Sequence, residues 1–261
     1  MVINQYDELD EVIKYIHQHL DEPLSLDSLA RYIAYSPFHF TRIFKERTGL
    51  SPMYYVSSLR LQKAKHLLLH TNLPVRDIGM EIGQQSLGTF TTRFTERIGL
   101  SPAHFRKSKE QADGHFTALK NFNNWTLPLL QSNELTTVKG TIKASTPFNG
   151  VILIGLFPKP IPEGLPIYGT LLPHLGEFYF TDVKPGVYYL MATSVEWEMK
   201  TTEFLLPHST LRTRAKKPII VGATPVPHQH VTLYPPQIDD PPILISLPLL
   251  MKNFLNRMSK K

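Results

Sequence analysis

Hydrophobic residues in the first 110 positions recur with the spacing of α-helices. Leu9, Val12, Ile13, Ile16 and Leu20 fall on one face of a helix and predict a buried apolar stripe. Later helices are indicated where a capping Ser or a Pro precedes the same spacing and where a Gly follows it. They are predicted after Ser25 and over 37–48, 52–70, 74–83, 86–98 and 103–109.

A short stretch of this helical pattern occurs twice. Nine of the thirteen residues in 40–52 are identical to those in 90–102, fifty positions later. In each copy a tight turn joins two short helices and the second helix is basic, which is typical of a helix-turn-helix. The helix between the copies, 52–70, would be about 28 Å long at about 1.5 Å per residue. That length can set two reading helices about one turn of duplex DNA apart, roughly 34 Å, so we predict binding to double-stranded DNA.

The second half of the chain alternates short β-rich runs with Pro and Gly turns, which predicts an antiparallel β-sandwich. The clearest stretch, 176–190, has a strand, a turn at Pro185-Gly186 and a second strand, and predicts a hairpin. A final amphipathic segment, 249–258, predicts a short helix. The predicted strands are 137–143, 151–157, 177–181, 187–194, 218–221 and 230–234.

Proline separates the two halves. Only five of the 22 prolines precede residue 110, each where a helix can begin or break, and the others lie among the β-rich runs. The predicted fold is therefore multidomain, with α and β parts. It has an N-terminal all-α tandem helix-turn-helix domain over 1–109, a linker over 110–135 and a C-terminal antiparallel β-sandwich over 136–261.

Charge is also unevenly distributed within the net charge of +6. Residues 1–23 carry six acids against one Lys, whereas 24–109 carry thirteen Lys or Arg against five acids, a net charge of +8. The basic region is the one that holds the repeat, as expected of a protein that binds a polyanion. A basic segment taken alone is more often only a solvated surface, so charge supports the DNA hypothesis without carrying it.

The absence of cysteine excludes disulfides, thiolate metal sites and a cysteine nucleophile, and it fits a reducing cytoplasm. The N-terminus lacks the basic and apolar regions of a signal peptide. The most apolar runs, 151–157 and 242–251, are far shorter than the roughly 20 residues that a membrane helix needs. We therefore expect a soluble cytoplasmic protein without a membrane partner.

The paired copies resemble the AraC/XylS-type transcriptional regulators, whose DNA-binding domain is a tandem helix-turn-helix. The resemblance covers roughly residues 5–108 and rests on two correctly spaced copies with their caps and stops. The matching positions are Leu29, Ala30, Ala34, Ser36, 42–45 and 49–52 in the first copy, and 77–79, 82–83, 86–90, 93–94 and 99–106 in the second.

Three positions depart from the usual form of the family. Gln84 stands where an aromatic residue usually follows the glycine of the second turn, and Thr92 stands where an arginine is often found. Gly88 lies early in the second reading helix and has no side chain to reach a base. These differences predict that the second copy relies more on phosphates and DNA shape than on base edges. The domain order is also inverted, because the family more often places its sensing domain first.

The outward residues of the two reading helices are the candidate DNA contacts. The resemblance places Phe38, Thr41 and Arg42 against bases, and an arginine suits the O6 and N7 atoms of guanine. The alternatives are a salt bridge from Arg42 to Glu46, packing of Phe38 on its own turn, and threonine hydroxyls that cap the local backbone. The candidate set is Pro37, Phe38, His39, Thr41, Arg42 and Lys45 with Leu87, Gly88, Thr89, Thr91 and Thr92.

Basic residues outside the reading helices are candidate phosphate contacts, and solvated surface charge is the alternative for each of them. The backbone N–H groups after Ser36 and Ser86 are further candidates, because helix N-termini bind anions. The basic residues are Arg60, Lys63, Lys65, Arg106 and Lys107.

The segment 176–190 also resembles part of the transthyretin-like or carboxypeptidase-regulatory-like β-sandwiches. Together the resemblances imply an effector or assembly domain, and we predict neither an enzyme nor a cofactor. The alternative is that this domain is a carbohydrate- or small-molecule-binding module, or an enzyme, that the DNA-binding part controls or localises. His228 and His230 lie on one strand face, but no third ligand is identifiable and no metal is predicted. The predicted partners are double-stranded DNA, a small-molecule effector, a second copy in a homodimer, and RNA polymerase if the protein is an activator.

Overall fold

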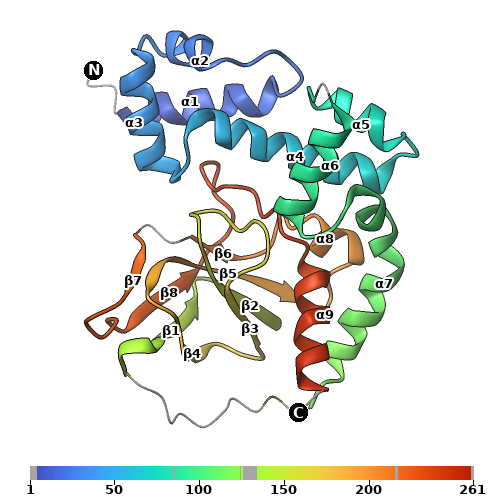
Figure 1. Cartoon of the computed structure of the whole chain (residues 1–261), viewed down its shortest axis with the longest axis vertical. Helices are drawn as coiled ribbons and strands as arrows, with labels where there is room; N and C mark the ends of the chain where they lie inside the picture. The colour runs from blue at the N-terminus through green and yellow to red at the C-terminus, as the bar shows by residue number, and fades with distance from the viewer. Residues whose placement is uncertain (1–4, 85, 124, 126–133, 215–216, 260–261) are drawn as a thin grey trace. The chain divides into compact units, whose positions relative to one another are not determined.

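The computed structural model describes residues 5–84, 86–123, 125, 134–214 and 217–259. The chain divides into two compact units. The first contains the chain up to Arg106 together with the later segment Gln237–Leu244, and the second contains Lys107–Pro236 and the chain from Ile245 on. Figure 1 labels the helices of the first unit and the strands of the second.

The helices of the first unit follow the predicted pattern closely because each has local start and stop signals. The side-chain oxygens of Ser25, Ser36 and Ser86 cap helices. Gly49 and Gly99 end helices in the left-handed conformation, with φ of 80° and 88°. The helices are α1 (Gln5–Gln18), α2 (Leu26–Tyr32), α3 (Pro37–Thr48), α4 (Pro52–His70), α5 (Val75–Glu81) and α6 (Leu87–Ile98).

The two copies of the repeat build the same aromatic core. In each copy a central phenylalanine contacts two other aromatic rings at centroid distances of 5.4–5.7 Å. The third ring comes from the following helix, α4 or α7 (Pro102–Lys120), so the repeat extends beyond the thirteen matched residues. The trios are Phe40, Phe44 and Tyr55 in the first copy, and Phe90, Phe94 and Phe105 in the second.

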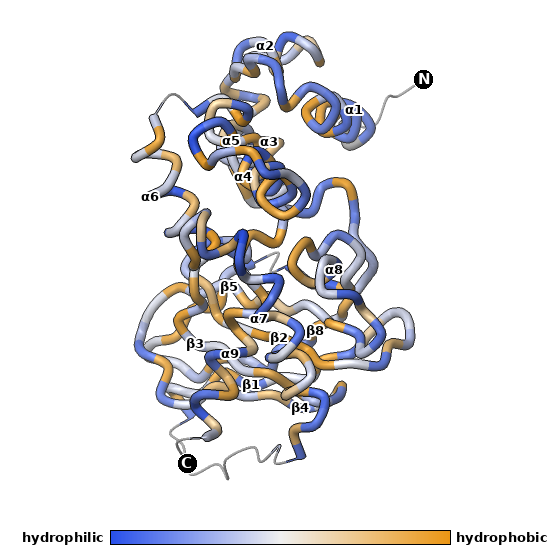
Figure 2. Tube along the Cα trace, turned by 90° about the vertical axis from the view of Figure 1, so that its right-hand side faces the viewer, coloured by the Kyte–Doolittle hydropathy of each residue, from blue (hydrophilic) through white to orange (hydrophobic). Residues whose placement is uncertain are grey.

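The first helix buries one face, as its spacing predicted. Figure 2 shows both hydrophobic and hydrophilic residues along α1. Leu9, Val12, Ile13 and Ile16 are all buried in the core of the helical unit. Among the described residues, no helix combines the length and the hydrophobicity that crossing a membrane requires.

The second unit is rich in β-structure, and its described strands form two main sheets in the orders β4-β1-β8 and β3-β2-β5-β6, with β7 paired to β5. One hydrophobic core takes residues from both sheets, for example Phe178 and Ile154. The strands are β1 (Val138–Ala144), β2 (Gly150–Phe157), β3 (Tyr168–Leu172), β4 (Gly176–Phe180), β5 (Gly186–Glu196), β6 (Arg212–Thr213), β7 (Ile219–Val221) and β8 (Gln229–Leu233).

The pairing of β1 with β8 is parallel, so the prediction of purely antiparallel strands is wrong for this pair. Parallel neighbours need a long crossover rather than a hairpin. Here the chain between β1 and β8 passes through the other sheet before it returns. The short strands β3 and β6 had no predicted counterpart.

The predicted hairpin around Pro185-Gly186 is also wrong. Strand β4 pairs with β1, whereas β5 pairs with β2, so the two strands that flank this turn lie in different sheets. The connection begins with Asp182 at a φ of 54° and buries Val183 in the shared core. A hairpin needs a short turn that keeps both strands in register, and this longer connection takes the chain from one sheet to the other.

The unit boundaries differ from the predicted ones at two places. Helix α7 continues to Lys120, well into the predicted linker, and its Phe116 packs on Trp197 and Phe204 at centroid distances of 5.5 and 4.8 Å. The segment Gln237–Leu244 belongs with the helical unit rather than with the β-rich one. Residues 124 and 126–133 of the predicted linker lie outside the described residues. The second unit also contains the 3-10 helix Glu134–Thr136, α8 (Thr201–Leu205) and the predicted C-terminal helix, α9 (Leu247–Met258).

Candidate nucleic-acid interface

Helix α3 turns one face to the core and the other to solvent. The Oγ atom of Ser36 accepts a hydrogen bond from the His39 N–H at 3.3 Å, which caps the helix. Pro37 occupies the first helical position, where an N–H would have no partner in the helix. Phe40 and Phe44 are buried with no exposed surface. Packing of the inner face therefore fixes the position of the helix, and the outer residues of its N-terminal half are accessible to a ligand.

Most of the residues predicted on α3 are accessible. Phe38 is 84% exposed, so its ring does not pack on its own turn as the alternative proposed. His39 and Thr41 are half-buried, and the Thr41 hydroxyl donates to the Pro37 carbonyl at 2.8 Å. The exposed members of the predicted set are Pro37, Phe38, Arg42 and Lys45.

Arg42 is held by its neighbours on the same helix. Its Nη1 lies 2.8 Å from Glu46 Oε1, and its Nη2 lies 3.3 Å from His39 Nδ1. The salt bridge that competes with base recognition is thus present in the protein without DNA. Both partners are more than half exposed, and such a pair contributes about 0–1 kcal/mol. A guanine or a phosphate can replace Glu46 at little cost.

Helix α6 repeats this construction with different outward side chains. The Oγ atom of Ser86 accepts a hydrogen bond from the Thr89 N–H at 3.4 Å. Arg93 donates to Gln84 Oε1 at 3.2 Å, which ties α6 to the turn before it. Thr91 is half-buried, and the exposed members of the predicted set are Leu87, Gly88, Thr89 and Thr92. The outer face of α6 therefore presents hydroxyl and apolar groups where α3 presents Arg42 and Lys45.

The basic residues predicted as phosphate contacts lie in different environments. Arg60 and Arg106 donate to backbone carbonyls of the helical unit, and Lys63 pairs with acidic side chains. Lys65 is only 1% exposed, so its prediction as a phosphate contact is wrong. It falls on the buried stripe of α4 together with Leu61 and Leu68.

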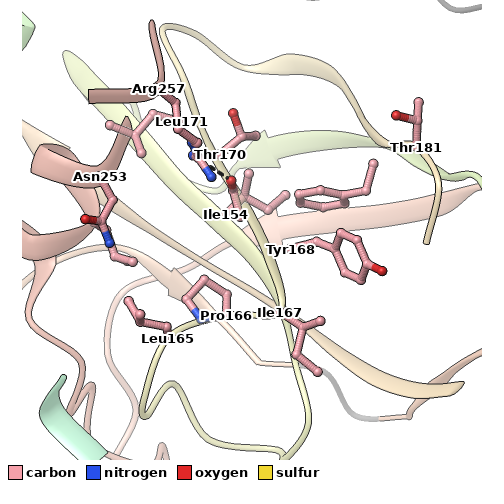
Figure 3. Close-up of a pocket in the computed structure, with 13 residues that line it drawn as sticks. Ile154, Leu165, Pro166, Ile167, Tyr168, Thr170, Leu171, Thr181, Asn253 and Arg257 are labelled. Atoms are coloured by element: carbon pink, nitrogen blue, oxygen red, sulfur yellow. Dashed lines mark hydrogen bonds between the residues drawn. The ribbon is translucent and has the colours of Figure 1, made fainter. Parts of the chain in front are cut away.

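The β-rich unit contains a pocket of about 350 Å³ that no sequence pattern predicted (Figure 3). Its lining is about equally polar and apolar and comes from β2, residues 165–167, β3, the end of β4 and α9, for example Ile154, Leu171 and Asn253. Arg257 on α9 adds a positive charge, and its Nη2 donates to the Gly169 carbonyl at 2.9 Å. These residues are too far apart in sequence for spacing to reveal them.

The two histidines considered as half of a metal site are close to each other. The ring centroids of His228 and His230 are 4.9 Å apart, and His228 Nε2 lies 2.8 Å from the Thr141 hydroxyl. Within the described part of the chain, His, Asp and Glu residues form no group of three or more that could hold a metal ion.

Most of the helical unit matches a known protein family. A family profile described as "Helix-turn-helix domain" matches residues 29–108, which include α3, the spacer α4 and α6. Residues 29–108 are a helix-turn-helix domain. The helix-turn-helix predicted from the sequence is confirmed for this part of the chain.

Curated regulators are similar to the helix-turn-helix part of this chain. The HTH-type transcriptional regulator YobQ of Bacillus subtilis is 38% identical over 96 residues, which cover 37% of this chain and 40% of YobQ. Transcriptional regulator Rob of Salmonella typhimurium is 36% identical over 100 residues, 38% of this chain and 35% of Rob. The bifunctional transcriptional activator/DNA repair enzyme AdaA of Bacillus subtilis is 32% identical over 105 residues, 40% of this chain and 50% of AdaA. The matches thus span half or less of each relative.

Solved structures are similar over a comparable share of the chain. The DNA-binding domain of AdpA, solved in complex with a target DNA, is 27% identical and covers 40% of this chain and 94% of its own, with a TM-score of 0.38. An AraC-type transcriptional regulator from Chromobacterium violaceum is 29% identical and covers 40% of this chain and 92% of its own, also with a TM-score of 0.38.

Proposed function

We propose that the protein is a sequence-specific transcription regulator that binds duplex DNA through α3 and α6, each in one of two adjacent major-groove segments. The observation that carries the proposal is the pair of identically capped helices with exposed N-terminal residues, in a domain whose relatives are named transcriptional regulators. A cytoplasmic location accords with the cysteine-free sequence. We propose no catalytic role for either unit; the DNA repair activity in the name of AdaA belongs to that protein.

In this proposal the two reading helices make different kinds of contact with DNA. On α3, Arg42 binds a guanine and Phe38 contacts a thymine methyl group, so this helix specifies sequence. On α6, Thr89 and Thr92 donate to phosphates or base edges, and this helix mainly positions the protein. The N–H groups at both capped helix starts favour nearby phosphates.

Selection of binding sites from random duplexes, followed by footprinting of the full chain, tests the proposal. Two protected segments are expected, with centres about 10–10.5 base pairs apart, because successive major grooves on one face are one helical turn apart. Enrichment of no sequence above the starting pool would refute sequence-specific regulation. A single protected segment would refute the two-groove arrangement.

Replacing Arg42 with alanine is expected to cost about 1–3 kcal/mol of binding free energy at one base position and to relax specificity there. Binding-site selection with the variant measures the effect. Lys45→Ala, which removes another exposed cation from α3, is the control and should weaken binding evenly across sequences. The same even weakening by Arg42→Ala would mean that Arg42 makes only an electrostatic contact.

For the second unit, we propose a β-sandwich of the transthyretin-like or carboxypeptidase-regulatory-like kind that binds a small effector. Support comes from the two sheets that share one core and from the pocket, whose volume of about 350 Å³ suits a small molecule. A lining that combines apolar side chains such as Ile154 and Leu250 with the cation of Arg257 favours a molecule with an apolar part and a carboxylate. Homodimer formation and contact with RNA polymerase stay predictions from the family resemblance, with no residues assigned to them.

Octanoate is a suitable probe of this pocket because octanol has the same chain length without the charge. We expect octanoate to raise the melting temperature of the full chain more than octanol does, and Arg257→Gln to remove that difference. Lys252→Gln, an exposed cation on the same helix outside the pocket lining, is the control and should keep it. Equal effects of octanoate and octanol on the unaltered chain would argue against an anionic effector.

A further inference from the structure

Eight residues from the C-terminal half of the chain complete the helical unit. This segment, Gln237–Leu244, is here called the strap. It lies between β8, which ends at Leu233, and α9, which begins at Leu247, so both of its ends continue into the β-rich unit. Residues 239–244 are all buried, including the acids Asp239 and Asp240. A buried acidic segment in a loop needs specific partners, since an unpaired buried charge is strongly unfavourable.

The first part of the strap is attached to the first helix-turn-helix copy. Asp239 Oδ2 lies 2.9 Å from Nε of Arg47, in the last turn of α3, and Asp239 is only 4% exposed. The same guanidinium reaches Asp10 on α1 at 3.1 Å, so Arg47 joins the strap to two helices. The Tyr55 hydroxyl donates to the Ile238 carbonyl at 3.1 Å.

The last part of the strap contacts Lys65 of α4, which lies next to the aromatic core of the second copy. Lys65 Nζ donates to the carbonyls of Ile243 and Leu244, each at 3.2 Å. The same ammonium lies 5.5 Å from the centroid of the Phe105 ring, which in turn packs on Phe94 of α6 at 5.7 Å. Lys65 thus connects the strap to the aromatic core under the second reading helix.

The strap contacts lead to equivalent positions in the two copies of the repeat. Tyr55 and Phe105 occupy the same place in the two aromatic trios, fifty positions apart. The strap bonds to Tyr55 directly and reaches Phe105 through Lys65, so one short segment is tied to both cores. We propose that the strap is a brace that fixes the separation of the two reading helices, and that its release loosens binding to two adjacent grooves more than binding to one. Only the part of this inference that concerns DNA binding rests on the proposed two-groove function.

The physical basis is the effective concentration of the second reading helix once the first is bound. Two linked binding modules gain most when the link holds them at the spacing of their sites, and they lose that gain when the link becomes flexible. A released strap would leave the two copies joined by α4 and their own packing alone. The gain in affinity from the second groove should then fall, whereas the contact of each helix with its own groove should not.

The test uses a double variant, Asp239→Asn with Lys65→Met, in the full chain. It removes one acid and one base at the strap and leaves the formal net charge unchanged. The control, Asp182→Asn with Lys143→Met, makes the same two exchanges at exposed positions of the β-rich unit. Position 182 has a φ of 54°, which asparagine adopts readily.

The distance between the reading helices is measured first, without DNA. Because the chain has no cysteine, spin labels at Lys45→Cys and Thr95→Cys, which are equivalent exposed positions on α3 and α6, report that distance by pulsed electron resonance. A narrow distribution that broadens in the strap variant and not in the control supports the brace, and an unchanged distribution overturns it. If the double variant loses its helical circular dichroism, Asp239→Asn alone decides by the same criterion.

Affinity is then measured without labels on a two-groove duplex and on a shorter duplex that ends before the second groove, since phosphate contacts by α6 would survive a scrambled sequence. The strap variant should lose about tenfold on the two-groove duplex and less than about twofold on the other. Equal losses on both duplexes would overturn the brace. If the unaltered chain selects no DNA sequence, the proposed function fails, and the distance measurement still decides whether the strap fixes the separation of the helices.

Discussion

Alanine in place of Phe94 is expected to lower the free energy of unfolding of the helical unit by about 3–5 kcal/mol. Phe94 is fully buried at the centre of the second aromatic trio, between Phe90 and Phe105. Its removal loses the burial of the ring and leaves a cavity that packed neighbours fill only in part. Urea unfolding followed by far-ultraviolet circular dichroism measures the change.

Thr92→Ala is the matched control, since Thr92 is exposed on the same helix two positions before Phe94. An exposed substitution of this kind should stay within about 0.5 kcal/mol of the unaltered chain. A loss below about 1 kcal/mol for Phe94→Ala would mean that α6 does not depend on this core. Under the proposed function, in which α6 contacts DNA, the variant should also lose DNA binding in proportion to its unfolded fraction.

The stability of the helical unit should rise with pH between about 7 and 10, and Lys65→Met should remove most of that rise. Burial lowers the pKa of Lys65 to about 7 in the folded protein, against about 10.4 for an unfolded lysine. Between these values the unfolded chain holds a proton that the folded chain has released, so raising the pH favours folding. The free energy of unfolding should rise by about 1.4 kcal/mol per pH unit in this range, or by several kcal/mol between about pH 7 and pH 10. Below pH 7, Lys65 should cause no change with pH.

Urea unfolding at pH 7, 8, 9 and 10, taken as the difference between the unaltered chain and the variant, isolates this contribution from other titrating groups. Lys63→Met is the control because Lys63 lies two positions earlier on α4 and pairs with acids at the surface. It should leave the slope unchanged. If Lys65→Met keeps the slope of the unaltered chain, the Lys65 ammonium is not titrating in the folded state.

The helical unit could be predicted from the sequence because its signals are local. A serine such as Ser36 or Ser86 caps a helix through contacts three residues away, and Gly49 or Gly99 stops it through its own backbone angle. The outward residues of α3 followed in turn, since burial of Phe40 and Phe44 leaves Phe38 and Arg42 on the other face. Here the sequence reveals both the elements and the faces they expose.

The strand pairing of the β-rich unit and the burial of the strap could not be predicted from local sequence patterns. The run 176–190 contains two correct strands, yet nothing in it states that β4 pairs with β1 and β5 with β2. Asp239 and Asp240 have the composition of an exposed turn, and their burial depends on Arg47 and other residues far earlier in the chain. The pocket around Arg257 likewise forms only when distant strands and α9 meet.

The strap also has a consequence for the order in which the protein is made. Lys65 and Leu244 are 179 residues apart, so the contact between them closes only after most of the chain has left the ribosome. The helical part is synthesised first but stays incomplete until residues 237–244 arrive. A product cut short in translation before that point would lack the piece that completes its reading module. Because of this order along the chain, the helical unit is completed only in chains that already contain the strands of the β-rich unit.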